Sequence, residues 1–326
     1  MYETRQIDIS IYENVYEYPI GRIEYNLRDM PETYQREDEV KFEYKRCISE
    51  PDMHFGEMTA YKAAQKIGIP CCKVELYKSP YYNKPDVYEI GAISHFDLSS
   101  DDSLISADSL MYKYYKKNKL ENDYMPDIDS IFDAVYEKFR SEERPFYEFL
   151  KFKRDFISML MFDLTFGNYD RGPINWFLRK NNKTGEIDLY PMFDNEAILG
   201  FSDEILEDTS YIKIANFNNI RESKVTIKKD REKRRYTDFR EMYKYLLEKY
   251  PIETEFATRK INRFTIDDLN EILDNLPGIS DKRKDFTRKN YLYRKMTMDR
   301  IFEDYLERKQ KDKIKGIIAY DDRLSS

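Results

Sequence analysis

The stretch 167–200 holds the residues whose types and spacing could carry chemistry. Asp170 is followed five positions later by Asn175, and a second aspartate, Asp194, comes after two short apolar runs. A carboxylate can accept the proton of a hydroxyl group, while an amide oxygen and a second carboxylate can hold Mg²⁺ against phosphates. The three residues would therefore suit phosphoryl transfer from ATP, with Asp170 acting on the hydroxyl and the other two acting on Mg²⁺.

The elements around these residues would hold them together. The spacing D-x-x-x-x-N is the one found in the catalytic loop of protein kinases. Residues 145–167 form a long, mostly apolar pattern that begins at Pro145, a good first residue for a helix, and leads straight into the loop. The runs 175–180 and 187–193 flank the turn formers of 181–186, which indicates a hairpin. Such a hairpin would bring Asn175 and Asp194 within reach of one metal ion.

Residues 1–98 are predicted to form a small β-rich lobe with a single helix. Helical periodicity covers 56–67 and ends at Gly68, a natural residue for a helix C-terminus. Strand, strand, helix, strand, strand is the order of a kinase small lobe. The strand patterns lie at 7–13, 21–29, 39–45, 71–77 and 87–96, with Pro80 and Pro85 in the last turn.

Four residues of this lobe are candidates for binding the nucleotide. Lys45 ends the alternating strand 39–45, where a kinase fold places the lysine that grips the α- and β-phosphates, although a solvent-facing lysine would fit the same pattern. Glu57 lies in the first turn of the predicted helix, where it would either favour the helix dipole or pair with that lysine. If the polar stretch 97–109 connects two lobes, backbone groups near Ser94 and Phe96 would bind adenine.

Residues 99–326 are predicted to form a mostly helical large lobe, which makes the chain an α+β protein with a two-lobed, kinase-like fold. The stretch 200–235 is expected to be an irregular, activation-type segment, and the charged tail after 309 is expected to fray. The predicted helices of this lobe lie at 131–139, 145–167, 236–250, 265–276 and about 280–309.

Composition narrows the class of protein. With 326 residues, 41% of them hydrophobic and 36% charged, the chain is expected to be soluble and globular. It has no apolar run long enough for a membrane span and no signal-peptide pattern, and its three cysteines do not make a disulfide framework, so we place it in the cytoplasm. A net charge of −7 argues against direct nucleic-acid binding. The basic segment 221–235 is either a solvated face or a site for an acidic partner.

The motif GNYDRGPINWFL followed by YPMFDNEAIL resembles the HipA-like kinases. In that family the loop runs G-N-x-D-R-H-x-x-N, and the metal aspartate lies in P-x-[FY]-D. The run KFEYKR, GEMTAYKAAQKIGIPCCKVEL and GAISHFD is similar to the family's small lobe, so the resemblance covers about residues 21–200. The larger N-terminal region of HipA is not seen, so the resemblance leads us to expect a compact, core-only member.

Carried over by this resemblance, Asp170 is the catalytic aspartate, Asn175 is a metal ligand and Asp194 is the metal aspartate. Lys45 would be the nucleotide lysine and Glu57 its partner, with Lys41 as the alternative lysine. Two features depart from the pattern. Gly172 replaces the histidine that usually follows Asp-Arg, and no glycine-rich phosphate loop is recognisable.

The resemblance implies an ATP- and Mg²⁺-dependent kinase that phosphorylates Ser or Thr of a protein, which could be the chain itself. The run D-R-G-x-x-N-W also resembles type II phosphatidylinositol 4-kinases, so a lipid kinase is an alternative. The departure at Gly172 keeps open a pseudokinase that binds nucleotide or a partner without chemistry. An antitoxin-like partner is a further implication of the HipA resemblance.

Overall fold

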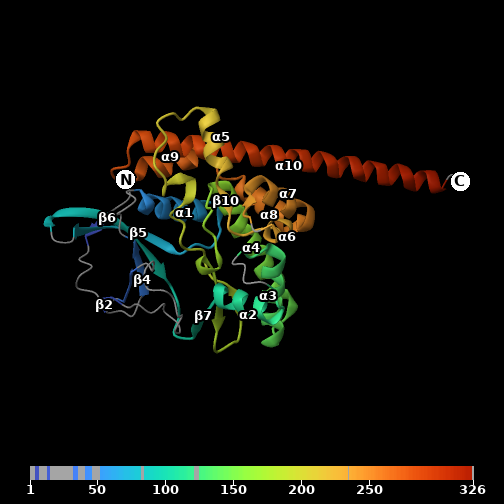
Figure 1. The fold of residues 1–326 in the computed structure, drawn as a ribbon, viewed down its shortest axis with the longest axis horizontal. Coiled ribbons are helices and arrows are strands. Elements are labelled where there is room, and N and C mark those ends of the chain that lie inside the picture. The colour runs from blue at the N-terminus through green and yellow to red at the C-terminus, as the bar shows by residue number, and fades with distance from the viewer. Residues whose placement is uncertain are drawn as a thin grey trace.

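The computed structural model describes the chain in one long part and several short strands. Backbone is described for 4–6, 13–14, 32–35, 41–45, 52–81, 84–120, 125–233 and 235–324. Side chains are described for 52–77, 90–120, 125–233 and 235–313. The small lobe is a sheet with helix α1 against it, and the remaining helices form the large lobe (Figure 1). This arrangement matches the predicted α+β fold.

A six-stranded sheet forms the small lobe, with the strand order β1-β5-β6-β4-β3-β2. The predicted strand 39–45 is present as β4, in which Lys41 lies opposite Phe96 and Lys45 lies opposite Ala92 of β6. The patterns at 7–13 and 21–29 fall almost wholly outside the described residues. The six strands are β1 (Thr4–Gln6), β2 (Glu13–Asn14), β3 (Glu32–Gln35), β4 (Lys41–Lys45), β5 (Lys73–Tyr81) and β6 (Lys84–Phe96).

The hairpin β5–β6 is longer than the sequence predicted. Pro80 and Pro85 were expected in its turn, but Pro80 lies in β5 and Pro85 lies in β6. The pairing register shifts at Pro80/Tyr81, which is where a residue without an N–H would interrupt the ladder. Antiparallel pairing of two long strands therefore overrode the local turn preference of the prolines.

Helix α1 (Met53–Ile67) packs against β5 and β6 of the small lobe and also against α9 (Ile266–Asn275) and η3 (Ile198–Gly200) of the large lobe. It begins three residues before the predicted start, so Glu57 lies in the second turn and not in the first. The dipole interpretation of Glu57 therefore fails, because that effect is confined to the first turn. Gly68 ends the helix in the left-handed region, φ 80°, as predicted.

The large lobe begins with a second, three-stranded sheet in the order β7-β8-β9. The stretch 97–109 was predicted to be a polar connection, yet it contains β7 (Asp102–Ser106) and the start of α2 (Ala107–Lys117). β7 pairs with β8 (Phe177–Asn181), which pairs with β9 (Ile187–Leu189). The hairpin predicted from the turn formers of 181–186 is thus confirmed, with a third strand added to it.

Helix α4 (Phe146–Phe166) is the central element of the large lobe. Pro145 is its N-cap, and Gly167 ends it with φ 72°, as the sequence predicted. All residues from Phe156 to Phe166 are buried, and α3 (Ile128–Ser141), α8 (Pro251–Ile261) and α10 pack around them. Each buried Phe, Leu or Met contributes about 1.5–3 kcal/mol, so the loop that follows Gly167 is attached to a rigid element.

The C-terminal half is helical and ends in a long projecting helix. α10 (Asp281–Leu324) crosses the body and extends beyond it (Figure 1). The backbone stays helical after 309, so the predicted fraying of the tail is not observed up to Leu324. The segment 200–235 was predicted to be irregular but contains α5 (Tyr211–Asn219) and α6 (Lys228–Glu232). The remaining elements are η2 (Pro173–Asn175), β10 (Glu222–Ser223), β11 (Thr237–Asp238) and α7 (Phe239–Lys249).

Candidate active site

The loop after α4 is closed by hydrogen bonds between its own residues. The backbone N–H of Asp170 donates to Asn168 Oδ1 at 3.0 Å, and Asn175 Nδ2 donates to the carbonyl of Asp170 at 2.7 Å. These bonds fix the backbone of Asp170 while its side chain stays about one third exposed. Because the amide nitrogen of Asn175 is engaged in this way, its oxygen is the atom that could bind a cation.

Arg171 connects this loop to the segment that carries Asp194. Its side chain is buried, and Nη1 donates both to the carbonyl of Asn175 at 2.8 Å and to the carbonyl of Phe193 at 2.6 Å. Nη2 also donates to Asn195 Oδ1 at 2.5 Å. One guanidinium group therefore binds the backbone of Asn175 and both neighbours of Asp194, which are Phe193 and Asn195.

Asp163, one turn before the end of α4, balances the charge of Arg171. The two form a buried, bidentate ion pair, with Arg171 Nε at 2.9 Å from Oδ2 and Nη2 at 3.1 Å from Oδ1. A planar guanidinium is suited to this geometry, and it retains donors for three further acceptors. The pair thus fixes the loop to the helix that precedes it.

The segment that carries Asp194 lies between the two lobes. The N–H of Cys72 donates to the carbonyl of Met192 at 2.9 Å, and the N–H of Met192 donates to the carbonyl of Pro70 at 3.1 Å. Phe193 packs against Phe96 and Phe177 with ring centroids 5.5 and 4.9 Å apart. The segment is therefore held on one side by backbone pairing and on the other by aromatic packing.

Asp194 has a left-handed backbone, φ 56°. For a residue with a side chain this conformation costs energy, but aspartate and asparagine adopt it more readily than other residues. Strained backbone of this kind gathers at functional sites when the surroundings hold it in place. Here the contacts of Phe193 and Asn195 on either side provide that hold.

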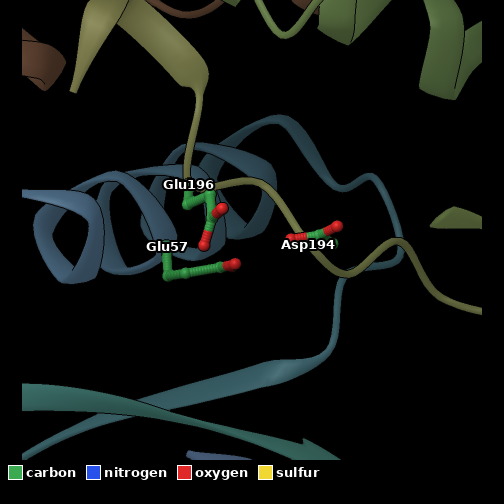
Figure 2. Close-up of side chains that lie close together, drawn as sticks. All are labelled: Glu57, Asp194 and Glu196. Carbon is green, nitrogen blue, oxygen red and sulfur yellow. The ribbon is translucent and has the colours of Figure 1, made fainter. Parts of the chain in front are cut away.

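Three carboxylates from two elements meet at this point (Figure 2). Glu57 reaches from α1 toward the segment of Asp194 and Glu196, and ligand oxygens of all three lie within 4.8 Å of one another. Glu57 is fully buried, and its Oε1 accepts the N–H of Asn195 at 3.0 Å. Oxygen donors in this arrangement are the ligands that Mg²⁺ prefers.

Gly56 allows α1 to approach this segment closely. A Cβ atom at position 56 would lie 2.3 Å from the carbonyl oxygen of Glu196, a distance that no real contact reaches. The absence of a side chain at this position therefore lets Glu57, the next residue, enter the carboxylate cluster.

A lysine from a distant segment contacts the side chain of Asp170. Lys224, directly after β10, forms an ion pair with Asp170 Oδ1, and its backbone N–H donates to the carbonyl of Tyr169 at 3.3 Å. Partial burial lowers the pKa of the Lys224 ammonium below its ordinary value. Lys224 thus contributes a positive charge at the carboxylate that the sequence marks as the proton acceptor.

The structure brings several of the predicted site residues together. Asp170 and Asn175 are joined by a hydrogen bond, and the segment of Asp194 is tied to both by Arg171. Lys45 and its alternative Lys41 lie in β4, but their side chains fall outside the described residues.

The two residues predicted near adenine lie at the large-lobe end of β6. Ser94 is buried, and its backbone takes part in the central strand between β4 and β5. Phe96, the last residue of β6, packs against Phe193 and Tyr190. The chain leaves the sheet directly after Phe96.

Three residues of this site were missed at the level of sequence. Glu196 lies only two positions after Asp194, so a search for neighbouring carboxylates would have found it. Arg171 stands inside the loop motif itself, although its partners lie elsewhere in the chain. Nothing in the local sequence singles out Lys224, which is one of eight basic residues between Arg221 and Arg235.

The fold of the chain is similar to that of a kinase of known structure. A crystal structure of CtkA, a proinflammatory kinase of Helicobacter pylori, matches with a TM-score of 0.67 over 94% of this chain and 99% of that chain. The chain has a kinase-like fold. The sequence identity to CtkA is 17%, so the likeness is one of fold. The two-lobed fold predicted from the sequence is confirmed by this match.

A second match is HipA from a Shewanella oneidensis MR-1 toxin–antitoxin complex with HipB and operator DNA. It has a TM-score of 0.49 and 10% identity, and it covers 80% of this chain and 58% of that chain. No protein-family model and no curated protein sequence matches the chain. Among the described residues, no helix is long and apolar enough to cross a membrane.

Proposed function

We propose that the chain is an ATP- and Mg²⁺-dependent kinase of the HipA-like type, which transfers the γ-phosphate to a Ser or Thr hydroxyl of a protein. The observation that carries this proposal is the guanidinium of Arg171, which binds the carbonyls of Asn175 and Phe193 with a single nitrogen. It supports a site in which the catalytic loop and the segment of Asp194 act as one unit.

In the proposed reaction the hydroxyl oxygen forms a bond to the γ-phosphorus as the bond to the bridging oxygen of ADP breaks. ADP leaves with that electron pair, and the hydroxyl proton passes to the Asp170 carboxylate. Asp170 suits this role because its backbone is held by Asn168 and Asn175 while its side chain stays partly exposed. Most of the catalytic effect would come from positioning and charge stabilisation.

The oxygen donors at the site fit Mg²⁺. Asn175 and Asp194 would hold the ion, and Glu57 and Glu196 place two more carboxylates near Asp194. Carboxylates this close repel one another, and a divalent cation among them would relieve that repulsion. When bound, Mg²⁺ would neutralise negative charge on the phosphates.

The small lobe would bind the nucleotide. We propose that Lys45, or Lys41 in its place, contacts the phosphates, that Glu57 orients that lysine, and that backbone groups near Ser94 and Phe96 bind adenine. The end of β6 at Phe96, shortly before β7, supports a lobe boundary at residue 98. A cytoplasmic location, an antitoxin-like partner and the absence of direct nucleic-acid binding stay predictions from the sequence.

The test is incubation of purified protein with γ-labelled ATP and Mg²⁺, alone and with a cell extract. The variants are Asp170→Asn and Asp194→Asn, and the matched control is Asp267→Asn, which changes an exposed aspartate of α9. Asparagine is chosen at 194 because it tolerates the positive φ better than alanine. We expect wild type and control to label protein at Ser or Thr, and both site variants to lose transfer.

Other outcomes identify the alternatives. Label in lipid would indicate the phosphatidylinositol 4-kinase type of activity. Mg²⁺-dependent ATP binding without transfer would indicate a pseudokinase, an alternative motivated by the departure at Gly172. Transfer that is unchanged in Asp170→Asn, or no ATP binding at all, would refute the proposal.

A further inference from the structure

In the basic segment 221–235, Lys224 pairs with a residue of the catalytic loop. Of the segment's described basic residues, Arg221 pairs with Asp203, Lys229 with Glu241, Arg231 with Asp127 and Arg235 with Asp230. Lys224 instead pairs with Asp170, the carboxylate proposed to act on the substrate hydroxyl. Four of the seven described basic residues in the segment are thus paired with acids other than Asp170, and Lys224 is paired with Asp170 itself.

We propose that Lys224 is a catalytic residue that binds the γ-phosphate during transfer. The inference rests on the proposed kinase function, and it names a residue that neither the D-x-x-x-x-N motif nor the Asp194 segment contains. Two observations support it. Lys224 forms an ion pair with Asp170, and the other cation of the loop, Arg171, has its donors bound to buried protein groups.

The backbone around Lys224 is firmly held. Its own N–H donates to the carbonyl of Tyr169, the residue before Asp170. Two residues later, the N–H of Thr226 donates to the carbonyl of Pro126 at 2.9 Å, and the carbonyl of Thr226 accepts the N–H of Ile128 at 3.0 Å. Val225 and Thr226 are fully buried. The lysine therefore projects from a fixed point, and only its flexible stem has to move.

Arg171 cannot supply the charge that the transfer requires. Its donors are directed at Asp163, Asn195 and two backbone carbonyls, all of them buried. The side chain of Lys224, in contrast, is 40% exposed, and that of Asp170 is 35% exposed. Among the described residues, Lys224 is the cation that forms an ion pair with the Asp170 carboxylate.

The chemistry of the proposed step places the phosphate near this cation. A general base lies about 2.6–3.2 Å from the hydroxyl it acts on, and that oxygen lies about 3–3.5 Å from the phosphorus it attacks. Lys224 contacts the same carboxylate, so a change in its side-chain conformation would bring its ammonium group to the γ-phosphate. The lysine ammonium is a compact charge on a flexible stem, which suits binding to phosphate.

Gly172 leaves room for the lysine stem. A Cβ atom at position 172 would lie 3.6 Å from Lys224 Cδ, which is ordinary contact, and nothing else lies within 4 Å of it. A large side chain at this position, two residues after Asp170, would compete with the stem of Lys224 for that space. The glycine at position 172 and the approach of Lys224 are therefore compatible features of one loop.

The experiment compares Lys224→Ala and Lys224→Arg with wild type, and uses Lys228→Ala as the matched control, since Lys228 is an exposed lysine of the same segment. Calorimetry measures the affinities for ADP and for the non-hydrolysable analogue AMP-PNP in the presence of Mg²⁺, and phosphotransfer assays measure kcat. We expect Lys224→Ala to lower kcat about 100-fold, by analogy with the loss of one transition-state donor. We also expect it to weaken AMP-PNP binding and leave ADP binding unchanged, because only AMP-PNP carries a γ-phosphate.

The expected pattern includes partial recovery in Lys224→Arg, which retains the charge, and wild-type behaviour in Lys228→Ala. A higher kcat in Lys224→Ala would overturn the inference and assign Lys224 as an inhibitory cap on Asp170. An unchanged kcat, or equal losses for ADP and AMP-PNP, would overturn it as well. If wild type binds AMP-PNP but transfers no phosphate, the kinase proposal fails while the binding comparison still tests Lys224. If wild type binds neither nucleotide, both proposals fail together.

Discussion

The carboxylate of Glu57 accepts the backbone N–H of Asn195 at 3.0 Å, so helix α1 of the small lobe is joined directly to the segment that carries Asp194. This bond holds Glu57, a buried acid of the small lobe, beside Asp194, a large-lobe residue with a left-handed backbone. A hydrogen bond to a charged acceptor contributes about 1.5–3 kcal/mol. The same carboxylate also belongs to the cluster with Asp194 and Glu196.

The two roles of Glu57 can be separated by substitution. Glu57→Gln keeps an oxygen that accepts from Asn195 but removes the charge, so we expect a loss of stability of about 1 kcal/mol or less together with weaker Mg²⁺-dependent ATP binding. Glu57→Leu leaves the Asn195 N–H without its acceptor and should cost roughly 2 kcal/mol more. Urea denaturation and calorimetric titration measure the two effects. Wild-type Mg²⁺ dependence in Glu57→Gln would limit Glu57 to a structural role.

Arg171 is expected to be the most destabilising site for substitution in the loop. Arg171→Met should cost about 3–5 kcal/mol, because it leaves Asp163 as a buried charge without its partner. Adding Asp163→Leu removes that charge, so the double variant should recover part of the loss. Chemical denaturation of both single variants and the double variant gives the coupling energy. Strictly additive losses would argue against a cooperative pair.

Two glycines offer a matched comparison. Gly56→Ala should destabilise the protein by about 1–3 kcal/mol, because its Cβ would collide with the carbonyl of Glu196, although alanine favours helices by about 1 kcal/mol. Gly172→Ala meets only ordinary contact and should change stability by about 0.5 kcal/mol or less. Thermal melting of both variants tests this pair. Similar melting temperatures for the two would contradict the close approach at Gly56.

The burial of His54 should make the free energy of unfolding depend on pH. Burial lowers its pKa from 6.5 to about 4, so at intermediate pH the unfolded chain binds a proton at this residue that the folded chain does not. Stability should therefore fall as the pH drops from about 6.5 to 4 and lose no more from this residue below that window. The full effect is roughly 3 kcal/mol. Urea denaturation of wild type and His54→Leu at pH 7 and 4.5 isolates it, and equal pH dependence in both would contradict it.

Several elements of the large lobe could be predicted from the local sequence. The helix 145–167, its glycine end and the hairpin around 181–186 were predicted from periodicity and turn residues, and the structure confirms them. The nearness of Asn175 to the Asp194 segment followed from that hairpin. Such features are readable because they depend on residues a few positions apart, where backbone preferences act directly.

Contacts between distant parts of the chain were decided by the tertiary structure. The start of α1 three residues early turned Glu57 from a first-turn acid into a buried acceptor, and pairing with β8 made a strand of the polar stretch 102–106. Lys224 reached Asp170 only because the backbone after β10 pairs with the residue before Asp170. Spacing along a sequence does not report such partners, since packing selects them from many residues of the same charge.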